Sequence, residues 1–357
     1  MTEAARWTQY AFLLFTALLG GLYLALPALT RPGVFFAVTV EPAFRKTGAG
    51  QRIVRGYRIV VAAATLMALG VTLWIDPTLH EQGLVWPMVG VLVAGTGAFL
   101  WARSRVLPHA AATPTVREAA VVPRTLSLPG GALAQSGPFL LLLATAGWLA
   151  LSWERIPARF PVHWNASGVA DAVMSRSPAA VFGPLVSSGL ACLFLLVVAA
   201  VVVRWSRRIA ASDGAAAAEG RFRRLVLLVV LGAEYLVAAT ASLTASLPLL
   251  GPQAERWTVP VVLGTTLVFV VVAVAAAVRM GQGGSRLPDG AAATDGTEDR
   301  YWKLGLLYVN PDDPAIFVEK RFGIGYTVNF GNRWAWLILA AIVVPIAAVI
   351  ALGLAQR

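Results

Sequence analysis

The sequence has little from which to build a disulfide framework or a metal centre. It contains one cysteine, Cys192, and three histidines among 357 residues. A single cysteine excludes a disulfide within this chain and a thiolate metal site, so we interpret Cys192 as a small packing residue. The histidines are His80, His109 and His163, and none belongs to an H-x-x-x-H or H-E-x-x-H spacing. We therefore expect no bound metal and no cofactor.

Catalytic motifs are also missing. The chain contains no G-x-x-x-x-G-K-[ST] phosphate loop and no G-x-S-x-G nucleophile elbow, and the Gly323-Ile324-Gly325 segment lacks the rest of a dinucleotide fingerprint. We expect no catalytic residues and a protein that is not an enzyme. An intramembrane enzyme would need His163 and Asp171 to face a cleft with a coordinated metal.

Charged residues are scarce and apolar ones abundant, at 13% and 58%, and the mean hydropathy is +0.71. Soluble domains average about a quarter charged residues, and about 20 apolar residues span a bilayer. The sequence therefore predicts an all-α integral membrane protein with about eight transmembrane helices. The apolar runs are Gln9–Leu29, Ile59–Ile75, Leu84–Ala102, Phe139–Trp153, Ala180–Val203, Leu225–Leu250, Val259–Val278 and Ala335–Leu354.

The net charge of +11 is unevenly distributed among the loops. Of the 29 Lys and Arg residues, 23 fall in four alternating loops, within residues 31–58, 103–124, 204–224 and 279–333. Positive residues are retained on the cytoplasmic side, which predicts four inner loops and both termini outside. We therefore interpret the excess of basic residues as an indication of membrane topology. We expect the lipid bilayer and its anionic inner leaflet as partners, and no nucleic acid.

The chain divides by composition into helical regions, two linkers and one β-rich insert. The expected units are a three-helix region (1–103), a flexible cytoplasmic linker (104–137), a helix pair (138–204) with an outer loop (154–179), a helix hairpin (205–279), a disordered linker (280–300), a cytoplasmic β-rich module (301–332) and the last transmembrane helix (333–357).

The β-rich module has two runs of strand-forming residues around a turn at Asn310–Pro314, with a second turn expected at Gly323–Gly325. We expect a small β-hairpin or meander that packs on the helices or on a partner, because an isolated hairpin is marginal in water. The candidate partner-binding residues are Tyr301, Trp302, Lys303, Asn310, Asp312, Asp313, Lys320 and Arg321.

A polar island from Arg155 to Asp171 interrupts the apolar runs. Its two prolines favour extended backbone, so His163 and Asn165 would point to one side, and a turn over Asn165–Gly168 would bring Asp171 back to them. The candidate ligand-binding residues of the island are His163, Asn165, Gly168 and Asp171. The alternative is that the polar side chains satisfy loop backbone groups and that Asp171 or Ser175 caps the following helix.

Glu234 is the only acidic residue deep within an apolar run, about ten residues into the sixth. At about 1.5 Å per residue it lies near the middle of the membrane, where an ionisable group is costly and commonly functional. It is a further candidate ligand-binding residue. The alternative is a protonated acid that is hydrogen-bonded to another helix.

Two segments resemble known families. The segment Ile156-Pro157-x-x-Phe160-Pro161-Val162-His163-Trp164-Asn165-x-x-Gly168-x-x-Asp171 resembles the P-x-H-[FW]-N-x-x-G-x-x-D signature of a domain of bacterial polytopic membrane proteins that include SdpI-type toxin-immunity proteins. The resemblance covers about Leu140–Val203. Phe35–Val40 is similar to the F-G-V-x-[VL]-P segment of larger members, with Ala37 in place of Gly. Tyr301–Asn332 looks like a second, uncharacterised module, Y-W-K-x-G-x-x-Y-x-N-P-D-D-P followed by K-R-x-G-x-G-x-T-x-N-F.

The resemblance implies a protein of the bacterial cytoplasmic membrane whose outer loop is the characteristic loop of the family. Immunity proteins of this type protect cells against a secreted toxin and can hold a repressor at the membrane. We therefore expect an immunity- or sensor-like protein that recognises a peptide or ligand outside and contacts a cytoplasmic regulator inside. The three-helix region and the β-rich module depart from a minimal immunity protein. The alternative is a small-solute or proton-coupled transporter that uses Glu234.

Overall fold

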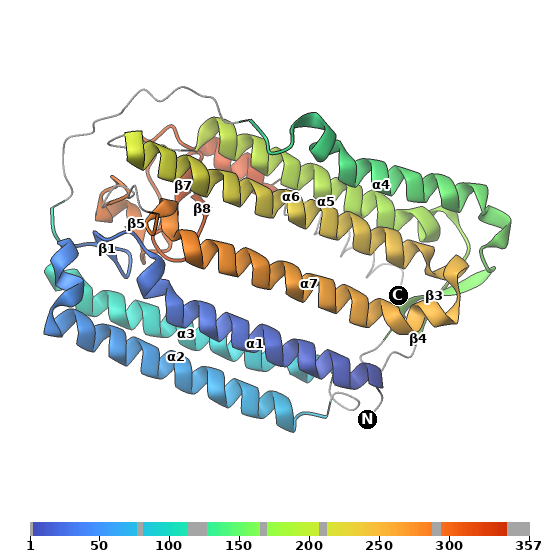
Figure 1. Cartoon of the computed structure of the whole chain (residues 1–357), viewed down its shortest axis with the longest axis horizontal. Coiled ribbons are helices and arrows are strands. Elements are labelled where there is room, and N and C mark those ends of the chain that lie inside the picture. Colours follow the sequence, from blue (N-terminus) through green and yellow to red (C-terminus); the bar gives the residue numbers. More distant parts are fainter. Residues whose placement is uncertain are drawn as a thin grey trace.

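The computed structural model describes residues 3–76, 81–112, 127–164, 170–206, 213–287 and 294–340. Within these ranges seven helices are long and apolar enough to cross a membrane, and they lie side by side (Figure 1). The prediction of a helical, multi-pass membrane protein is confirmed in this form. The helices are α1 Glu3–Leu29, α2 Gly48–Trp74, α3 Val85–Val106, α4 Gly131–Leu151, α5 Pro178–Trp205, α6 Asp213–Leu250 and α7 Pro252–Met280.

Short elements connect these helices. The 3-10 helices are η1 Pro42–Lys46, η2 Glu81–Leu84, η3 Leu107–His109, η4 Trp153–Arg155, η5 Gln282–Gly284 and η6 Asp299–Tyr301. The strands pair as four antiparallel hairpins, β1 Val34–Phe35 with β2 Val38–Thr39, β3 Arg159–Trp164 with β4 Ala170–Ser175, β5 Trp302–Lys303 with β6 Leu307–Tyr308, and β7 Phe317–Glu319 with β8 Tyr326–Val328.

The eighth predicted span falls largely outside the described residues. Residues 333–340 are helical, and they mark where this helix starts. The remainder, 341–357, is not described, so the count of eight spans and the outside location of both termini stay predictions.

The helices form two groups that α7 joins. The three N-terminal helices pack on one another, and α4, α5 and α6 form the second group, while α7 contacts both α1 and α6. Only Gly251, at φ +80°, separates α6 from α7, a backbone conformation that glycine adopts without steric cost. Pro252 then begins α7, where its missing N–H is not needed.

The two ends of the helix bundle carry different hairpins (Figure 1). The β3–β4 hairpin lies at one end, while β1 and the strands of the β-rich module gather at the other. We call these the outer end and the inner end, after the topology that the loop charges predict. The described residues of the four basic segments lie at the inner end, where α1, α3, α5 and α7 end.

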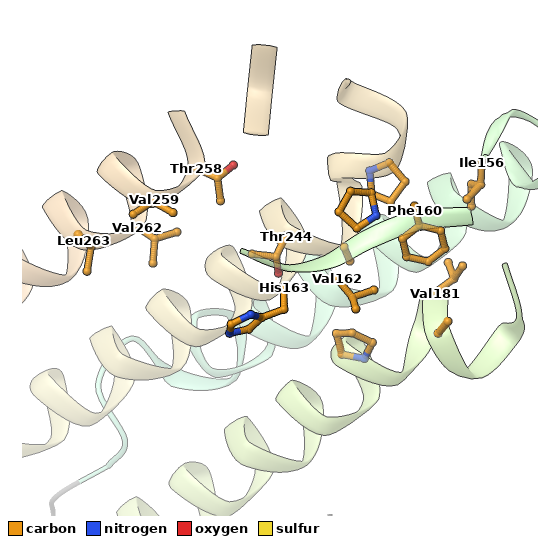
Figure 2. Close-up of a pocket in the computed structure, with 15 residues that line it drawn as sticks. Ile156, Phe160, Val162, His163, Val181, Thr244, Thr258, Val259, Val262 and Leu263 are labelled. Atoms are coloured by element: carbon orange, nitrogen blue, oxygen red, sulfur yellow. The ribbon is translucent and has the colours of Figure 1, made fainter. Parts of the chain in front are cut away.

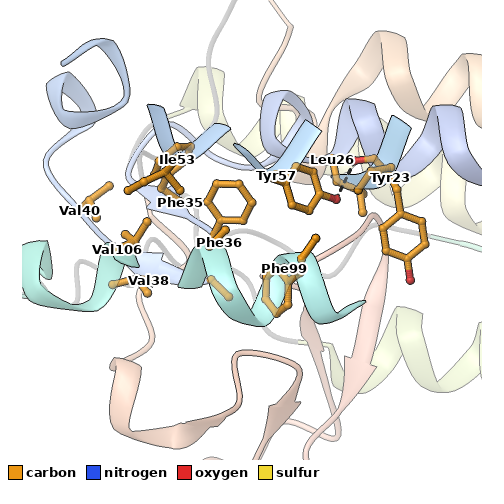
Figure 3. Packing of buried hydrophobic residues seen from close by; sticks show 14 residues of the cluster. Tyr23, Leu26, Phe35, Phe36, Val38, Val40, Ile53, Tyr57, Phe99 and Val106 are labelled. Carbon is orange, nitrogen blue, oxygen red and sulfur yellow. Dashed lines mark hydrogen bonds between the residues drawn. The ribbon is translucent and has the colours of Figure 1, made fainter. Parts of the chain in front are cut away.

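The β1–β2 hairpin is buried within the inner end of the three-helix region (Figure 3). Its two turn residues, Phe36 and Ala37, have φ values of +45° and +59° and are buried. Two central residues with positive φ define a type I′ turn, which normally carries Asn-Gly. Tyr57 closes the packing by donating a hydrogen bond to the carbonyl of Tyr23 at 2.8 Å. Ala37 therefore has a backbone conformation that glycine adopts at lower cost.

The β-rich module consists of two hairpins that are joined at one edge. A parallel bridge between Tyr308 and Asn329 connects β6 to the end of β8, and the Asn329 side chain donates to the carbonyl of Asn310 at 2.8 Å. The Asn310 side chain in turn accepts from the backbone N–H of Asp312 at 3.0 Å, which forms the predicted turn. The prediction of small hairpins in this module is thus confirmed.

Both predicted linkers are shorter than expected. In the linker predicted over 104–137, α3 continues to Val106 and α4 begins at Gly131. In the disordered linker predicted over 280–300, the described residues are ordered, because Gln282 and Asp295 are buried and hydrogen-bonded. Composition alone suggested disorder, but Gly281, Gly283 and Gly284 adopt positive φ in a tight turn. The intervening 113–126 and 288–293 lie outside the described residues.

Candidate functional site

An open cavity of about 450 Å³ lies beneath β3 at the outer end (Figure 2). The hairpin forms its roof with Phe160, Pro161, Val162 and His163, while α5, α6 and α7 form the floor and walls. The volume falls within the range of small-molecule sites. The described part of the predicted polar island therefore borders a pocket.

Most of the cavity wall is apolar, and the three polar residues among its described lining differ in what they can offer a ligand. Thr244 donates its hydroxyl to the carbonyl of Thr240, and Thr258 donates to that of Ala254, both at 2.9 Å. Both donors are thus used within their own helices. His163 is the remaining polar side chain that lines the cavity. The site fits a ligand with an apolar body and one polar group.

His163 is held by Asp171 from the opposite strand. Its Nδ1 lies 2.5 Å from Oδ1 of Asp171, and both side chains are exposed. A register shift in β3 at His163 aims the two side chains at one another, as bulges often do beside binding sites. When Nδ1 carries the proton it donates to Asp171, which leaves Nε2 as an acceptor. The structure thus brings together two of the four predicted island residues.

The other two island residues, Asn165 and Gly168, lie outside the described residues. The predicted capping role of Asp171 or Ser175 is wrong, because both residues are in β4. Ser177 caps α5 instead, accepting a hydrogen bond from the N–H of Ala180 at 3.2 Å.

Arg176 fixes the base of the hairpin, a role that the sequence interpretation missed. Its Nη1 donates to the carbonyls of Trp153 and Ile156 at 2.8 and 3.1 Å, and the guanidinium lies over the Trp153 ring at 5.6 Å from its centroid. These contacts attach the end of β4 to the end of α4. A basic residue beside the start of an apolar run, facing an aromatic residue at the end of the preceding one, was the available signal.

Glu234 lies within α6 and away from the outer cavity. Its side chain is fully buried, and neither carboxylate oxygen has a hydrogen-bond partner among the described residues. The Cys192 thiol donates to the backbone carbonyl of Glu234 at 3.5 Å. The described residues therefore do not show the alternative, a protonated acid that is hydrogen-bonded to another helix. The structure does not bring Glu234 together with His163 and Asp171.

The candidate partner-binding residues of the inner module divide by burial. Trp302, Asn310 and Arg321 are buried, and their contacts are internal, so they hold the module together and offer no surface to a partner. Trp302, for example, donates Nε1 to Thr297 Oγ1 at 2.8 Å. The residues that retain exposed surface are Tyr301, Lys303, Asp312, Asp313 and Lys320.

A network of buried ion pairs attaches this module to the helices. Arg31, just after α1, forms a two-pronged pair with Glu319 of β7 at 2.8–3.0 Å. Burial alone would lower the pKa of Arg31, but the carboxylate of Glu319 raises it above its ordinary value. On α6, Glu219 and Arg223 form a further buried pair at 2.9 Å, and Arg223 reaches the module by donating to the Tyr326 hydroxyl at 3.3 Å. These pairs were not predicted from the sequence.

Arg321 lies at the centre of the module. It binds Asp295 through two nitrogens at 2.7 and 2.9 Å and Asp299 at 2.5 Å. Burial alone would raise the pKa of Asp295, but Arg321 and the hydrogen bonds from Thr297 hold it below its ordinary value. The only available signal in the sequence was the occurrence of acidic residues within otherwise basic loops.

Two further arginines hold the buried β1–β2 hairpin by its carbonyl groups. Arg103 of α3 donates to the carbonyl of Ala37 at 2.5 Å. Arg45 of η1 donates to the carbonyl of Arg31 at 2.6 Å and also to that of Val34. Arginines of the inner loops therefore stabilise the fold, in addition to indicating the membrane topology.

Comparison with known proteins finds two matches, each to a small part of the chain. A domain of unknown function (DUF1648) matches residues 140–187, which include most of α4, the β3–β4 hairpin and the start of α5. A family of unknown function (DUF5808) matches residues 311–336, which include β7 and β8. No curated protein and no solved structure matches the chain. The two matches thus fall on the outer hairpin and on the inner module.

Proposed function

We propose that this protein is a non-enzymatic, immunity- or sensor-like protein of the bacterial cytoplasmic membrane. The outer cavity beneath β3 recognises an apolar peptide or ligand, and the inner module contacts a cytoplasmic regulator. The observation that carries the proposal is the pocket beneath the β3–β4 hairpin. His163 lines this pocket, and Asp171 is hydrogen-bonded to His163.

The chemistry of the pocket supports a binding role. An apolar cavity with one oriented polar group is typical of ligand sites, and His163 supplies that group. A peptide with apolar side chains and one hydrogen-bonding group, such as a secreted toxin that inserts into membranes, has the matching chemistry. This agrees with the resemblance of residues 156–171 to SdpI-type immunity proteins.

Two helices provide a physical connection between the ends. α6 carries Thr244 in the outer cavity and the Glu219–Arg223 pair at the inner end. α7 carries Thr258 in the cavity and is followed by Gln282, which donates to the carbonyl of Gly325 in the module at 3.0 Å. A ligand that shifts the outer ends of these helices would act on the inner module through rigid elements.

The proposal is tested by challenging cells that lack the protein with secreted peptide toxins and by complementing them with variants. We expect sensitivity in the deletion strain, rescue by the unaltered protein, and no rescue by His163→Ala or by Ala245→Phe, which fills the cavity. Matched controls are Arg159→Gln on the exposed surface of β3 and Ala239→Phe on the exposed surface of α6. Both controls should restore resistance.

The same strains test the inner half of the proposal. A regulator should co-purify with the unaltered protein and lose affinity when Lys303 and Asp312, which are exposed on the module, are replaced by alanine. Absence of any sensitivity phenotype together with absence of a cytoplasmic partner would contradict the proposed function.

A second candidate function, proton-coupled or small-solute transport, is favoured by Glu234. An unpartnered acid buried in a transmembrane helix is costly and is often retained for function. Transport predicts that Glu234→Gln abolishes uptake or efflux of a substrate while the protein still folds. Fluxes unchanged by this substitution across a broad substrate panel would exclude the transporter in favour of the sensor.

A further inference from the structure

A second open cavity, of about 520 Å³, lies near the inner end between α1, α3, α6 and α7. The turn between β7 and β8, residues 320–325, forms one of its walls. The cavity is separate from the outer one and shares no lining residue with it. The inner module therefore does more than cover the helix ends, since part of it lines a space between them.

The walls of this inner cavity are almost entirely apolar. Leu22 and Leu26 of α1, Val229 of α6, Ala277 of α7 and Phe322 of the turn are representative. Apolar surface of this kind favours hydrocarbon over water. Lipid acyl chains surround a membrane protein, so they are the most abundant hydrocarbon available to this cavity.

Among the described residues that line the cavity, Lys320 is the only charged one. Its backbone N–H donates to the carbonyl of Gly325 at 3.0 Å, which closes the turn, and Gly323 and Gly325 adopt positive φ there. No salt bridge to Lys320 occurs among the described residues, whereas the adjacent Arg321 is paired with Asp295. Lys320 is exposed at the surface, and the protein atoms around its ammonium group lower its pKa by partial desolvation.

We propose that the inner cavity binds one anionic phospholipid of the inner leaflet, with an acyl chain between the helices and the phosphate on Lys320. A single cation without a neighbouring carboxylate in the wall complements a net negative headgroup. The apolar walls explain why the anion would be a lipid, since a free phosphate would leave them unfilled. This inference does not depend on the proposed function of the outer cavity.

The test is lipid titration of the purified full-length protein in detergent, followed by native mass spectrometry. Three probes separate the sources of binding: phosphatidylglycerol, phosphatidylcholine with the same acyl chains, and glycerol 3-phosphate. We expect one phosphatidylglycerol to bind saturably and to survive detergent exchange. Phosphatidylcholine should bind more weakly, by roughly fivefold, the contribution of one lysine to an anionic lipid, and glycerol 3-phosphate should not bind.

Variants test the position of the site. Lys320→Gln should weaken phosphatidylglycerol binding by roughly fivefold, and Lys320→Arg should retain it. Lys303→Gln, an exposed lysine of the same module, should leave it unchanged. Val229→Phe should displace the lipid by filling the cavity, whereas Leu228→Phe on the exposed surface of the same helix should not.

Three results would overturn the proposal. If phosphatidylcholine binds as tightly as phosphatidylglycerol, the headgroup charge does not contribute to binding. If glycerol 3-phosphate binds as tightly, the acyl chain does not contribute. Equal weakening by Lys303→Gln and Lys320→Gln would indicate general electrostatic attraction. If Lys320→Gln fails to fold, Val229→Phe against Leu228→Phe still decides whether the lipid occupies this cavity.

Discussion

Arg31 and Glu319 form a buried, two-pronged ion pair although they lie 288 positions apart in the sequence. Arg31 follows the first helix and Glu319 belongs to β7, so the pair attaches the β-rich module to the N-terminal helices. Gln282 adds a contact to the same carboxylate at 3.4 Å. The module is therefore an integral part of the inner end.

Removing one partner of this pair should be strongly destabilising. Glu319→Gln removes the two-pronged carboxylate partner of the buried Arg31 guanidinium, which costs about 3 kcal/mol or more. Glu298→Gln, in an exposed pair with Arg300, should cost less than about 1 kcal/mol. The measurement is the free energy of unfolding in mixed detergent micelles. Equal losses in the two variants would show that the buried pair does not hold the module.

A substitution at Ala37, in the left-handed turn of the β1–β2 hairpin, should stabilise the protein. Ala37→Gly should increase stability by about 1 kcal/mol, because alanine adopts positive φ at a cost that glycine avoids. Gly305→Ala should decrease it, since an added Cβ would lie 2.8 Å from that of Ala37 and φ there is +74°. Thermal unfolding midpoints of the two variants should shift in opposite directions. A shift in the same direction would contradict the turn geometry.

Acid should weaken the inner module through Asp295. Because its folded-state pKa lies below the unfolded value of about 3.9, the stability that it contributes is present above that unfolded value and is lost as the pH falls toward the folded pKa. The thermal midpoint of the unaltered protein should therefore fall more steeply below about pH 4 than that of Asp295→Asn. Parallel curves for the two proteins would exclude this contribution.

Glu234 should impose a stability cost. Its carboxylate is buried without a hydrogen-bond partner among the described residues, and an unsatisfied buried polar group costs about 1–3 kcal/mol. Glu234→Leu should accordingly raise the free energy of unfolding in micelles by about 1 kcal/mol or more. A decrease would mean that the carboxylate makes a stabilising contact, and would remove the observation that favours transport.

The helices and the contact between His163 and Asp171 could be predicted from the sequence. Apolar run length located the seven described spans because the bilayer sets a fixed length for them. Two prolines and a turn segment were enough to expect Asp171 near His163, since these constraints are local. The cavity beneath them was not predicted, because it depends on how α5, α6 and α7 pack against the hairpin.

The inner end was predicted less well, for a physical reason. Loop charge reports which side of the membrane a loop occupies, but it does not report which arginines are buried. Arg31, Arg103 and Arg321 find their partners in segments distant in the sequence. The same tertiary contacts order the described residues of 280–300, whose composition alone resembles a disordered linker.

Site-specific photo-crosslinking in the outer cavity tests the central claim most directly. A photoreactive amino acid at Val262, which lines the cavity, should capture a discrete apolar peptide when protected cells are exposed to the toxin fraction. The same group at the neighbouring Val261, which is exposed on α7, should capture lipid alone. An identical set of adducts at the two positions would contradict ligand recognition by the outer cavity.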